Sequence, residues 1–113
     1  MPKYLWEVSY SPEGTKGLLK DGGSKRRTAA EKVLRAVGGR LEAFYYAFGK
    51  SDAYVIAEVP DAISVAAASL AINASGAVSV RTTVLLTPEE IDTATRKKVG
   101  YRLCKENSNC CYY

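Results

Sequence analysis

The side chains that could do chemistry in this sequence include no histidine. The chain therefore lacks the commonest general base and the usual protein ligand of zinc, non-haem iron and haem. Its three cysteines, Cys104, Cys110 and Cys111, all lie in the last ten residues. Neighbouring thiolates without histidine seldom complete a tetrahedral zinc site. We expect no metal site and no cofactor.

Arg81 is the most informative charged residue, because it interrupts a segment rich in valine and threonine. A buried guanidinium without a partner is costly, so Arg81 must be paired or hydrated. Glu7 and Glu58 lie in predicted neighbouring strands and are candidate partners in a cross-strand ion cluster. Alternatively Arg81 holds an anionic ligand, because its paired donors suit a carboxylate or phosphate. Tyr46 and Asp52 complete this candidate ligand-binding set.

Asp52 also has a structural interpretation, because it ends the segment Gly49-Lys50-Ser51-Asp52 between two strand-like segments. In a short turn, glycine allows a positive φ and aspartate accepts hydrogen bonds from turn amides. Both this role and an acid/base role for Asp52 remain open at this point.

A second candidate site is the glycine-rich, basic segment 22–27, Gly-Gly-Ser-Lys-Arg-Arg. Free amides, a helix N-terminus and the side chains of Ser24, Arg26 and Arg27 could together hold a phosphate or carboxylate. The segment lacks P-loop spacing. The alternative is a solvated basic turn in which Arg27 pairs with Glu31 four residues later.

The elements that position these residues follow from hydrophobic periodicity and capping signals. We expect strands over 3–10, 40–48, 53–59 and 77–86, and helices over 12–21, 24–37, 61–75 and 87–99. The β-α-β-β-α-β order predicts an α+β fold of the ferredoxin-like, split β-α-β kind, since right-handed crossovers place both helices on one face of a four-stranded antiparallel sheet. One domain over 1–102, with a C-terminal helix, and an irregular tail over 103–113 account for the 113 residues.

The face of the sheet without helices is expected to be both aromatic and charged. Alternation turns Tyr4, Trp6, Val8, Leu41, Tyr45, Val55 and Ala57 towards the helices, and Glu7, Phe44, Tyr46, Phe48, Tyr54, Ile56, Glu58 and Arg81 away from them. An apolar surface of this size is seldom left exposed to solvent. We expect a homodimer or higher oligomer, and a cavity between the sheet and its partner would suit a small anionic or aromatic metabolite.

One set of segments carries a family resemblance, namely 2–5, 8–10, 17–27, 38–39, 41–45 and 81–90. Together, within a match over residues 2–102, they resemble the GYD-domain family of small bacterial proteins. The resemblance implies a ferredoxin-like fold of the dimeric α/β-barrel type. The family is named for a Gly-Tyr-Asp element in the central hairpin. Gly49 and Asp52 are retained here, and Ser51 stands where the family has tyrosine.

Charge and composition narrow the function classes. No apolar run approaches the ~20 residues that span a bilayer, and the first ten residues lack a secretory signal. We expect a cytoplasmic protein with no membrane partner. A net charge of +4 allows anionic partners without requiring them.

Three functions remain on the sequence alone. The first is a small-ligand binding or regulatory module, which suits a chain without histidine. The second, by analogy with the fold, is a cofactor-independent monooxygenase or isomerase-like enzyme. The third is RNA recognition, because Lys50 and 53–55 match part of an RNP1 pattern. Asp52 falls where that pattern needs a stacking aromatic residue, and Glu7 and Glu58 repel phosphates. Nucleic acid is therefore disfavoured.

Overall fold

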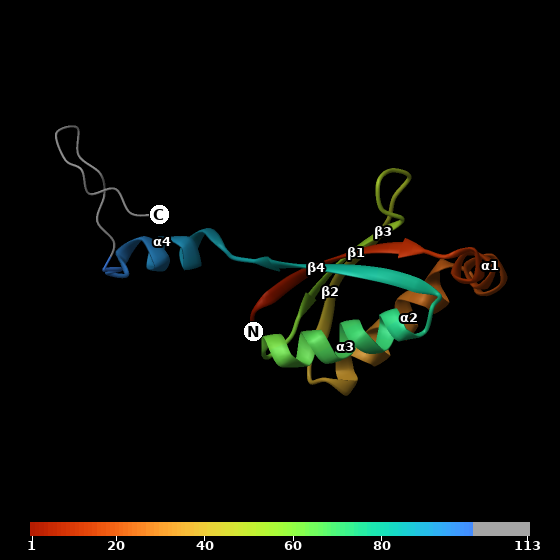
Figure 1. The fold of residues 1–113 in the computed structure, drawn as a ribbon, viewed down its shortest axis with the longest axis horizontal. Helices are drawn as coiled ribbons and strands as arrows, with labels where there is room; N and C mark the ends of the chain where they lie inside the picture. Colours follow the sequence, from red (N-terminus) through yellow and green to blue (C-terminus); the bar gives the residue numbers. More distant parts are fainter. Residues whose placement is uncertain (101–113) are drawn as a thin grey trace.

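A computed structural model describes residues 1–100 as one four-stranded sheet with four helices (Figure 1). The strands are β1 (Lys3–Tyr10), β2 (Arg40–Tyr46), β3 (Ala53–Glu58) and β4 (Val78–Leu85). The helices are α1 (Pro12–Asp21), α2 (Gly23–Ala36), α3 (Ala62–Ala74) and α4 (Pro88–Arg96). The sheet is antiparallel, in the order β2-β3-β1-β4. This confirms the predicted α+β, ferredoxin-like arrangement. The tail predicted over 103–113, with its three cysteines, lies outside the described residues.

The core lies between the sheet and helices α2 and α3, which cover one of its faces (Figure 1). Alternate residues of β1 are buried, as its period-two pattern predicts. Trp6 is 2% exposed, and Val55 of β3 lies opposite it in the antiparallel register. Leu34 of α2 and Val65 of α3 are buried on the helical side of this core. We call the uncovered side of the sheet its open face.

The helices begin at the residues that the capping signals indicate. The Ser11 hydroxyl accepts a hydrogen bond from the Gly14 amide at 3.1 Å, and the Asp61 carboxylate accepts one from the Ser64 amide at 2.8 Å. Thr87 and Glu90 form a complete capping box at the start of α4. Each of these side chains satisfies an amide that the first helical turn leaves without a partner.

Strand β2 contains a β-bulge that changes which side chains face the helices. The register against β3 shifts between Leu41, opposite Ala57, and Ala43, opposite Ile56, so Glu42 is an extra residue. Beyond the bulge every side chain turns to the other face. Phe44 and Tyr46 therefore lie on the helix side, and Tyr45, 71% exposed, lies on the open face. The faces predicted for these three residues were wrong.

Helix α4 leaves the body of the domain. It follows β4 after Leu86 and Thr87 and extends away from the sheet and the other helices (Figure 1). None of its residues is buried, and Ile91, its largest apolar side chain, is 47% exposed. An isolated helix of nine residues is only marginally stable in water. Helix α4 thus lacks the packing that usually stabilises so short a helix.

Candidate functional site

A cavity of about 320 Å³ lies between the helix side of the sheet and helices α2 and α3. Its walls come from all four strands and from both helices. Small side chains help to leave this space, because Ala29 and Ala30 of α2 and Ala71 of α3 all line it. Ala29 and Ala71 are themselves exposed, so the cavity has an opening to solvent. Its volume is at the lower end of the roughly 300–1,000 Å³ typical of small-molecule sites.

Two buried hydrogen-bond donors on side chains that line the cavity have no acceptor within residues 1–100. They are the indole Nε1 of Trp6 and the guanidinium Nε of Arg26, both of them buried atoms. A buried polar group without a partner costs roughly 1–3 kcal/mol, so most buried donors in native proteins are satisfied. Two unsatisfied donors on side chains that line one cavity point to a missing acceptor, which would reach these buried atoms only if the side chains shift.

The outer end of the cavity is bordered by Tyr10 at the end of β1. Burial raises the pKa of its phenol, and a hydrogen bond with Tyr46 raises that pKa further. Tyr46 in turn donates to the carbonyl of Gly23 at 3.2 Å, and its ring lies 5.1 Å from that of Phe44 between centroids. Tyr10 is therefore a neutral hydroxyl, and these contacts fix the start of α2 against β1 and β2.

The predicted anion site at Ser24, Arg26 and Arg27 is divided between two hollows. Ser24 and Arg27 border a second hollow of about 220 Å³ together with Tyr46, whereas Arg26 lines the main cavity. The first turn of α2 carries no acidic residue. Arg26 pairs instead with Asp21 of α1, its Nη2 lying 3.3 Å from Oδ2.

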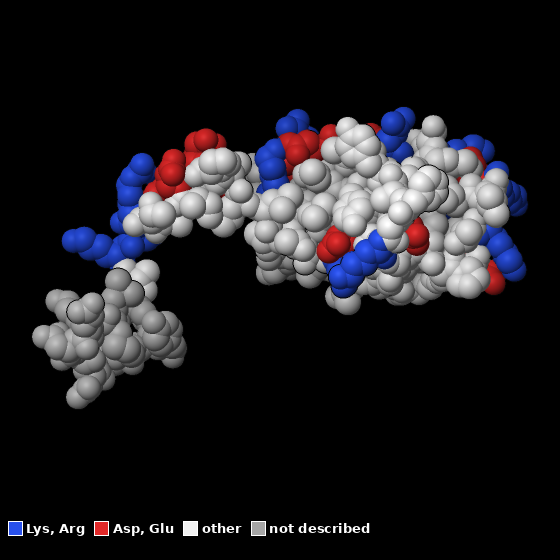
Figure 2. Space-filling view, turned by 90° about the horizontal axis from the view of Figure 1, so that it is seen from above, with Lys and Arg blue, Asp and Glu red and all other residues white. Residues whose placement is uncertain are grey.

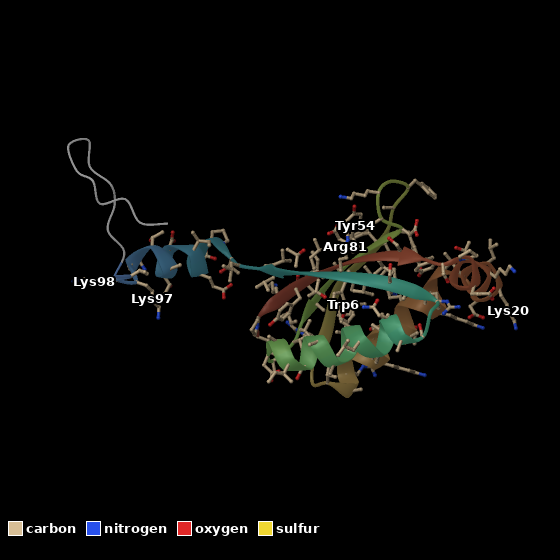
Figure 3. The ribbon with its side chains drawn as sticks, viewed as in Figure 1. Trp6, Lys20, Tyr54, Arg81, Lys97 and Lys98 are labelled. Atoms are coloured by element: carbon tan, nitrogen blue, oxygen red, sulfur yellow. The ribbon has the colours of Figure 1, made fainter. Side chains whose placement is uncertain are left out.

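On the open face, Arg81 of β4 lies directly opposite Glu7 of β1, and Glu7 lies opposite Tyr54 of β3. Figure 3 shows Arg81 and Tyr54 on this face and Trp6 on the side of the helices. The predicted proximity of Glu7 to Arg81 is confirmed by the register. Glu58 belongs to a different row, opposite Lys3 and Arg40.

Arg40 is the ion partner of Glu58, so the predicted cluster of Glu58 with Arg81 was wrong. The Arg40 guanidinium donates to Oε1 of Glu58 from Nε at 3.0 Å and from Nη2 at 2.6 Å. These hydrogen bonds lower the pKa of the Glu58 carboxyl. Lys3 pairs with Glu42 beside them. This edge of the open face is thus a network of two cations and two anions.

Asp52 holds the hairpin loop against β1. Its Oδ2 accepts a hydrogen bond from the Tyr10 amide at 2.8 Å, and its own amide donates to the Val8 carbonyl at 2.8 Å. The adjacent Ser51 is 1% exposed, and its hydroxyl has no partner within residues 1–100. The structural interpretation of Asp52 accounts for these contacts.

The structure brings Glu7 and Arg81 together and places the rest of the candidate set elsewhere. Glu58 lies at another row, Tyr46 on the opposite face, and Asp52 in the hairpin loop. Ligand binding by Arg81 stays a prediction. Sequence reasoning missed Trp6 and Tyr10 as cavity residues. The available signal was a tryptophan on the helix side of its strand, because a buried indole N–H usually finds a partner.

Within residues 1–100, no group of three or more cysteine, aspartate or glutamate side chains is placed to hold a metal ion. None of the helices in that range is long and apolar enough to cross a membrane.

Comparison with known proteins gives one match. The family model of the GYD domain matches residues 4–95, which is most of the chain. No curated protein and no solved structure matches it. The matched segment includes all of the sheet except Lys3, the helices that cover it and every residue of the cavity. The chain belongs to the GYD domain family.

Proposed function

We propose that this domain is a binding module for a small, largely apolar molecule, which occupies the cavity between the sheet and helices α2 and α3. The observation that carries the proposal is Trp6. Its side chain is almost completely buried on the wall of this cavity, and its indole N–H has no acceptor. A bound molecule with one acceptor atom would satisfy that donor and bury its apolar part against the neighbouring side chains.

The lining supports an apolar ligand. The wall includes the apolar side chains of Val8, Val33, Phe44 and Val80, and polar groups are few. Protein interiors are normally packed as densely as organic crystals, with few voids larger than a water molecule. A cavity of about 320 Å³ in so small a domain therefore suits a ligand rather than ordinary core packing.

Trp6 is the only tryptophan of the chain, so its fluorescence reports directly on the cavity. We would titrate the full chain with aromatic and straight-chain acids, amides and alcohols and record the intensity and wavelength of emission. Saturable changes with one or more of these probes are expected. Emission that no probe alters would contradict the proposal.

A filled cavity provides the second test. Ala30→Leu places three additional carbons at a wall position of α2 and keeps a strong helix former. It should weaken binding at least tenfold while the melting temperature stays at or above that of the parent. Ala36→Leu is the matched control, because Ala36 is exposed near the end of the same helix and does not line the cavity. It should bind as the parent does.

We also propose that the domain forms a homodimer through its open face. This face carries the apolar side chains of Leu5, Tyr45, Tyr54 and Ile56. It also carries three cations, Lys3, Arg40 and Arg81, and three anions, Glu7, Glu42 and Glu58. Figure 2 looks down on it and shows both signs spread over an otherwise uncharged surface. Because the charges balance, the face does not repel a copy of itself.

Helix α4 supports the same proposal. Leu86 is 56% exposed and Ile91 is 47% exposed, on a segment that extends beyond the sheet. Packing of these two apolar side chains against a second copy would supply the tertiary contacts that a short helix needs. A second copy that covers the open face would lie close to the point where β4 continues into α4.

Light scattering on the full chain at micromolar concentration tests the dimer. We expect a mass of two chains for the parent and of one chain for Ile56→Lys, because the lysine would bury a charge at the centre of the interface. Ile63→Lys is the control, since Ile63 is 83% exposed on the helix side. The Ile91→Lys variant tests whether α4 takes part in the dimer interface. A parent that runs as a monomer would overturn the proposal.

A further inference from the structure

We infer that the molecule bound in this cavity carries a carboxylate, whose oxygens accept hydrogen bonds from Arg26 and Trp6 while its apolar part fills the space between the helices. This inference rests on the proposed function and names the chemical class of its ligand. It assigns Arg26 and Trp6 as the binding residues.

The two donors without a partner determine which polar group the ligand must carry. Both unsatisfied atoms of the lining side chains, Nε1 of Trp6 and Nε of Arg26, are donors. Donors require an acceptor, so a ligand that offers only N–H or O–H groups would leave them unpaired. A carboxylate has two oxygens and about four lone-pair sites, enough for both donors at once.

The charge of the wall favours an anion. Arg26 is the one charged residue among those that line the cavity, and no acidic side chain lines it. The first turn of α2 adds Lys25 and Arg27 and contains no acidic residue. The positive end of the α2 dipole lies at the same turn. An anion in the cavity would therefore meet the positive charge of Arg26 on the wall, and the lining residues offer an ammonium group no opposite charge.

Arg26 is held in place before any ligand binds. One of its terminal nitrogens, Nη2, lies 3.3 Å from Oδ2 of Asp21. The same nitrogen lies only 2.0 Å from the position that a Cβ on Gly17 would occupy, so the guanidinium packs directly over the backbone of α1. Asp21 thus binds the far side of the guanidinium and leaves Nε without a partner. Such preorganisation lowers the entropic cost of binding.

The test compares molecules that share a shape and differ in one polar group. Phenylacetate, phenylacetamide and 2-phenylethylamine form an aromatic set, and octanoate, octanamide and octylamine form a straight-chain set. Each is titrated at pH 7 into the full chain, with Trp6 emission as the signal. In any set that binds, we expect the acid to bind at least tenfold more tightly than the amide and the amine not to bind.

Two arginine variants test whether Arg26 supplies the positive charge that binds the acid. Arg26→Gln should weaken binding of the acid at least tenfold and leave binding of the amide within about twofold of the parent. Arg27→Gln is the matched control, because it removes a cation from the same helical turn and does not line the main cavity. It should leave both affinities within about twofold. Circular dichroism confirms that both variants are folded.

The outcomes separate this inference from the function on which it rests. Two outcomes would contradict the carboxylate inference and still leave the cavity as a binding site. In one, an amide binds as tightly as its acid; in the other, the Arg26→Gln variant binds the acid as the parent does. If no member of either set binds to the parent, both the inference and the proposed function fail.

Discussion

Arg40 and Glu58 face each other across β2 and β3, and both hydrogen bonds from the guanidinium reach the same carboxylate oxygen, Oε1. The Glu58 side chain is almost buried, whereas that of Arg40 is largely exposed. The carboxylate thus lies in the sheet surface under a guanidinium that faces solvent. This arrangement makes the ionised form of Glu58 part of the folded structure.

The first prediction concerns pH. Arg40 lowers the pKa of Glu58 below its ordinary value of 4.5 in the folded state. The stability that this pair contributes is therefore fully present above pH 4.5 and is lost as pH falls through the folded pKa. We expect Glu58→Gln to melt lower than the parent at pH 7 and the difference to shrink below pH 4.5. Melting temperatures between pH 3 and pH 7 measure this, at constant ionic strength. Arg40→Gln, which removes the cause, should show the same convergence.

The second prediction concerns the core. Leu34 of α2 is completely buried. Leu34→Ala should lower the free energy of unfolding by roughly 2–5 kcal/mol, through lost apolar burial and the cavity that remains. Leu19→Ala makes the same chemical change on α1, where the side chain is 83% exposed, and should stay within about 0.5 kcal/mol. Urea unfolding of both variants gives the comparison. Equal effects would place Leu34 outside the core.

The third prediction concerns a glycine inside a helix. Alanine normally stabilises a helix interior by roughly 0.5–1 kcal/mol over glycine. At Gly14 of α1 the sign should reverse, because a Cβ there would lie 1.9 Å from the carbonyl oxygen of Ala77 and the backbone must move. We expect a loss of about 1–3 kcal/mol on chemical denaturation. A more stable Gly14→Ala variant would show that the two segments do not touch.

Gly17 of the same helix is the informative contrast. There a Cβ would meet only the end of the Arg26 side chain, which can swing away. Gly17→Ala should therefore keep the stability of the parent or exceed it, while it displaces the guanidinium and weakens binding of the acids described above. Denaturation and fluorescence titration on one sample separate the two effects.

The fourth prediction concerns Asp52. The hydrogen bond from the Tyr10 amide to its carboxylate fixes the hairpin loop to the end of β1. Asp52→Ala should lower stability by about 1 kcal/mol, the ordinary net value of one such bond at an exposed site. Asp52→Asn keeps an acceptor oxygen and should recover most of the loss. If Asp52 also had an acid/base role, asparagine would restore stability without restoring that activity.

The sequence was sufficient for the fold because its signals are local. Alternating burial in β1, the caps at Ser11, Asp61 and Thr87, and the glycines near helix ends each act within a few residues. Right-handed crossovers then leave few topologies for the elements in this order. The family resemblance agreed with the same arrangement, and the match of the family model to residues 4–95 confirms the family.

The candidate site was less predictable, because it depends on register and on packing between elements. Glu58 was expected near Arg81, yet Arg81 lies opposite Glu7, and Glu58 lies opposite Lys3 four residues away along β1. At ~3.3 Å per residue that is roughly 13 Å, beyond the reach of an ion pair. The cavity likewise depends on how the elements pack, because Ala30 of α2 and Ala71 of α3 line it together. In the sequence, each alanine by itself indicates only a helix former with a small side chain and does not predict a cavity.

The bulge at Glu42 separates the two faces of the sheet in their response to chain length. Deletion of the Glu42 codon would restore regular alternation, and Phe44 and Tyr46 would stay on the helix side, because Leu41 and Ala43 already lie opposite neighbouring residues of β3. The same deletion would remove the anion that pairs with Lys3 on the open face. Relatives that lack this residue would therefore keep the cavity wall and change the charge of the open face. The two faces can thus diverge independently through insertion and deletion.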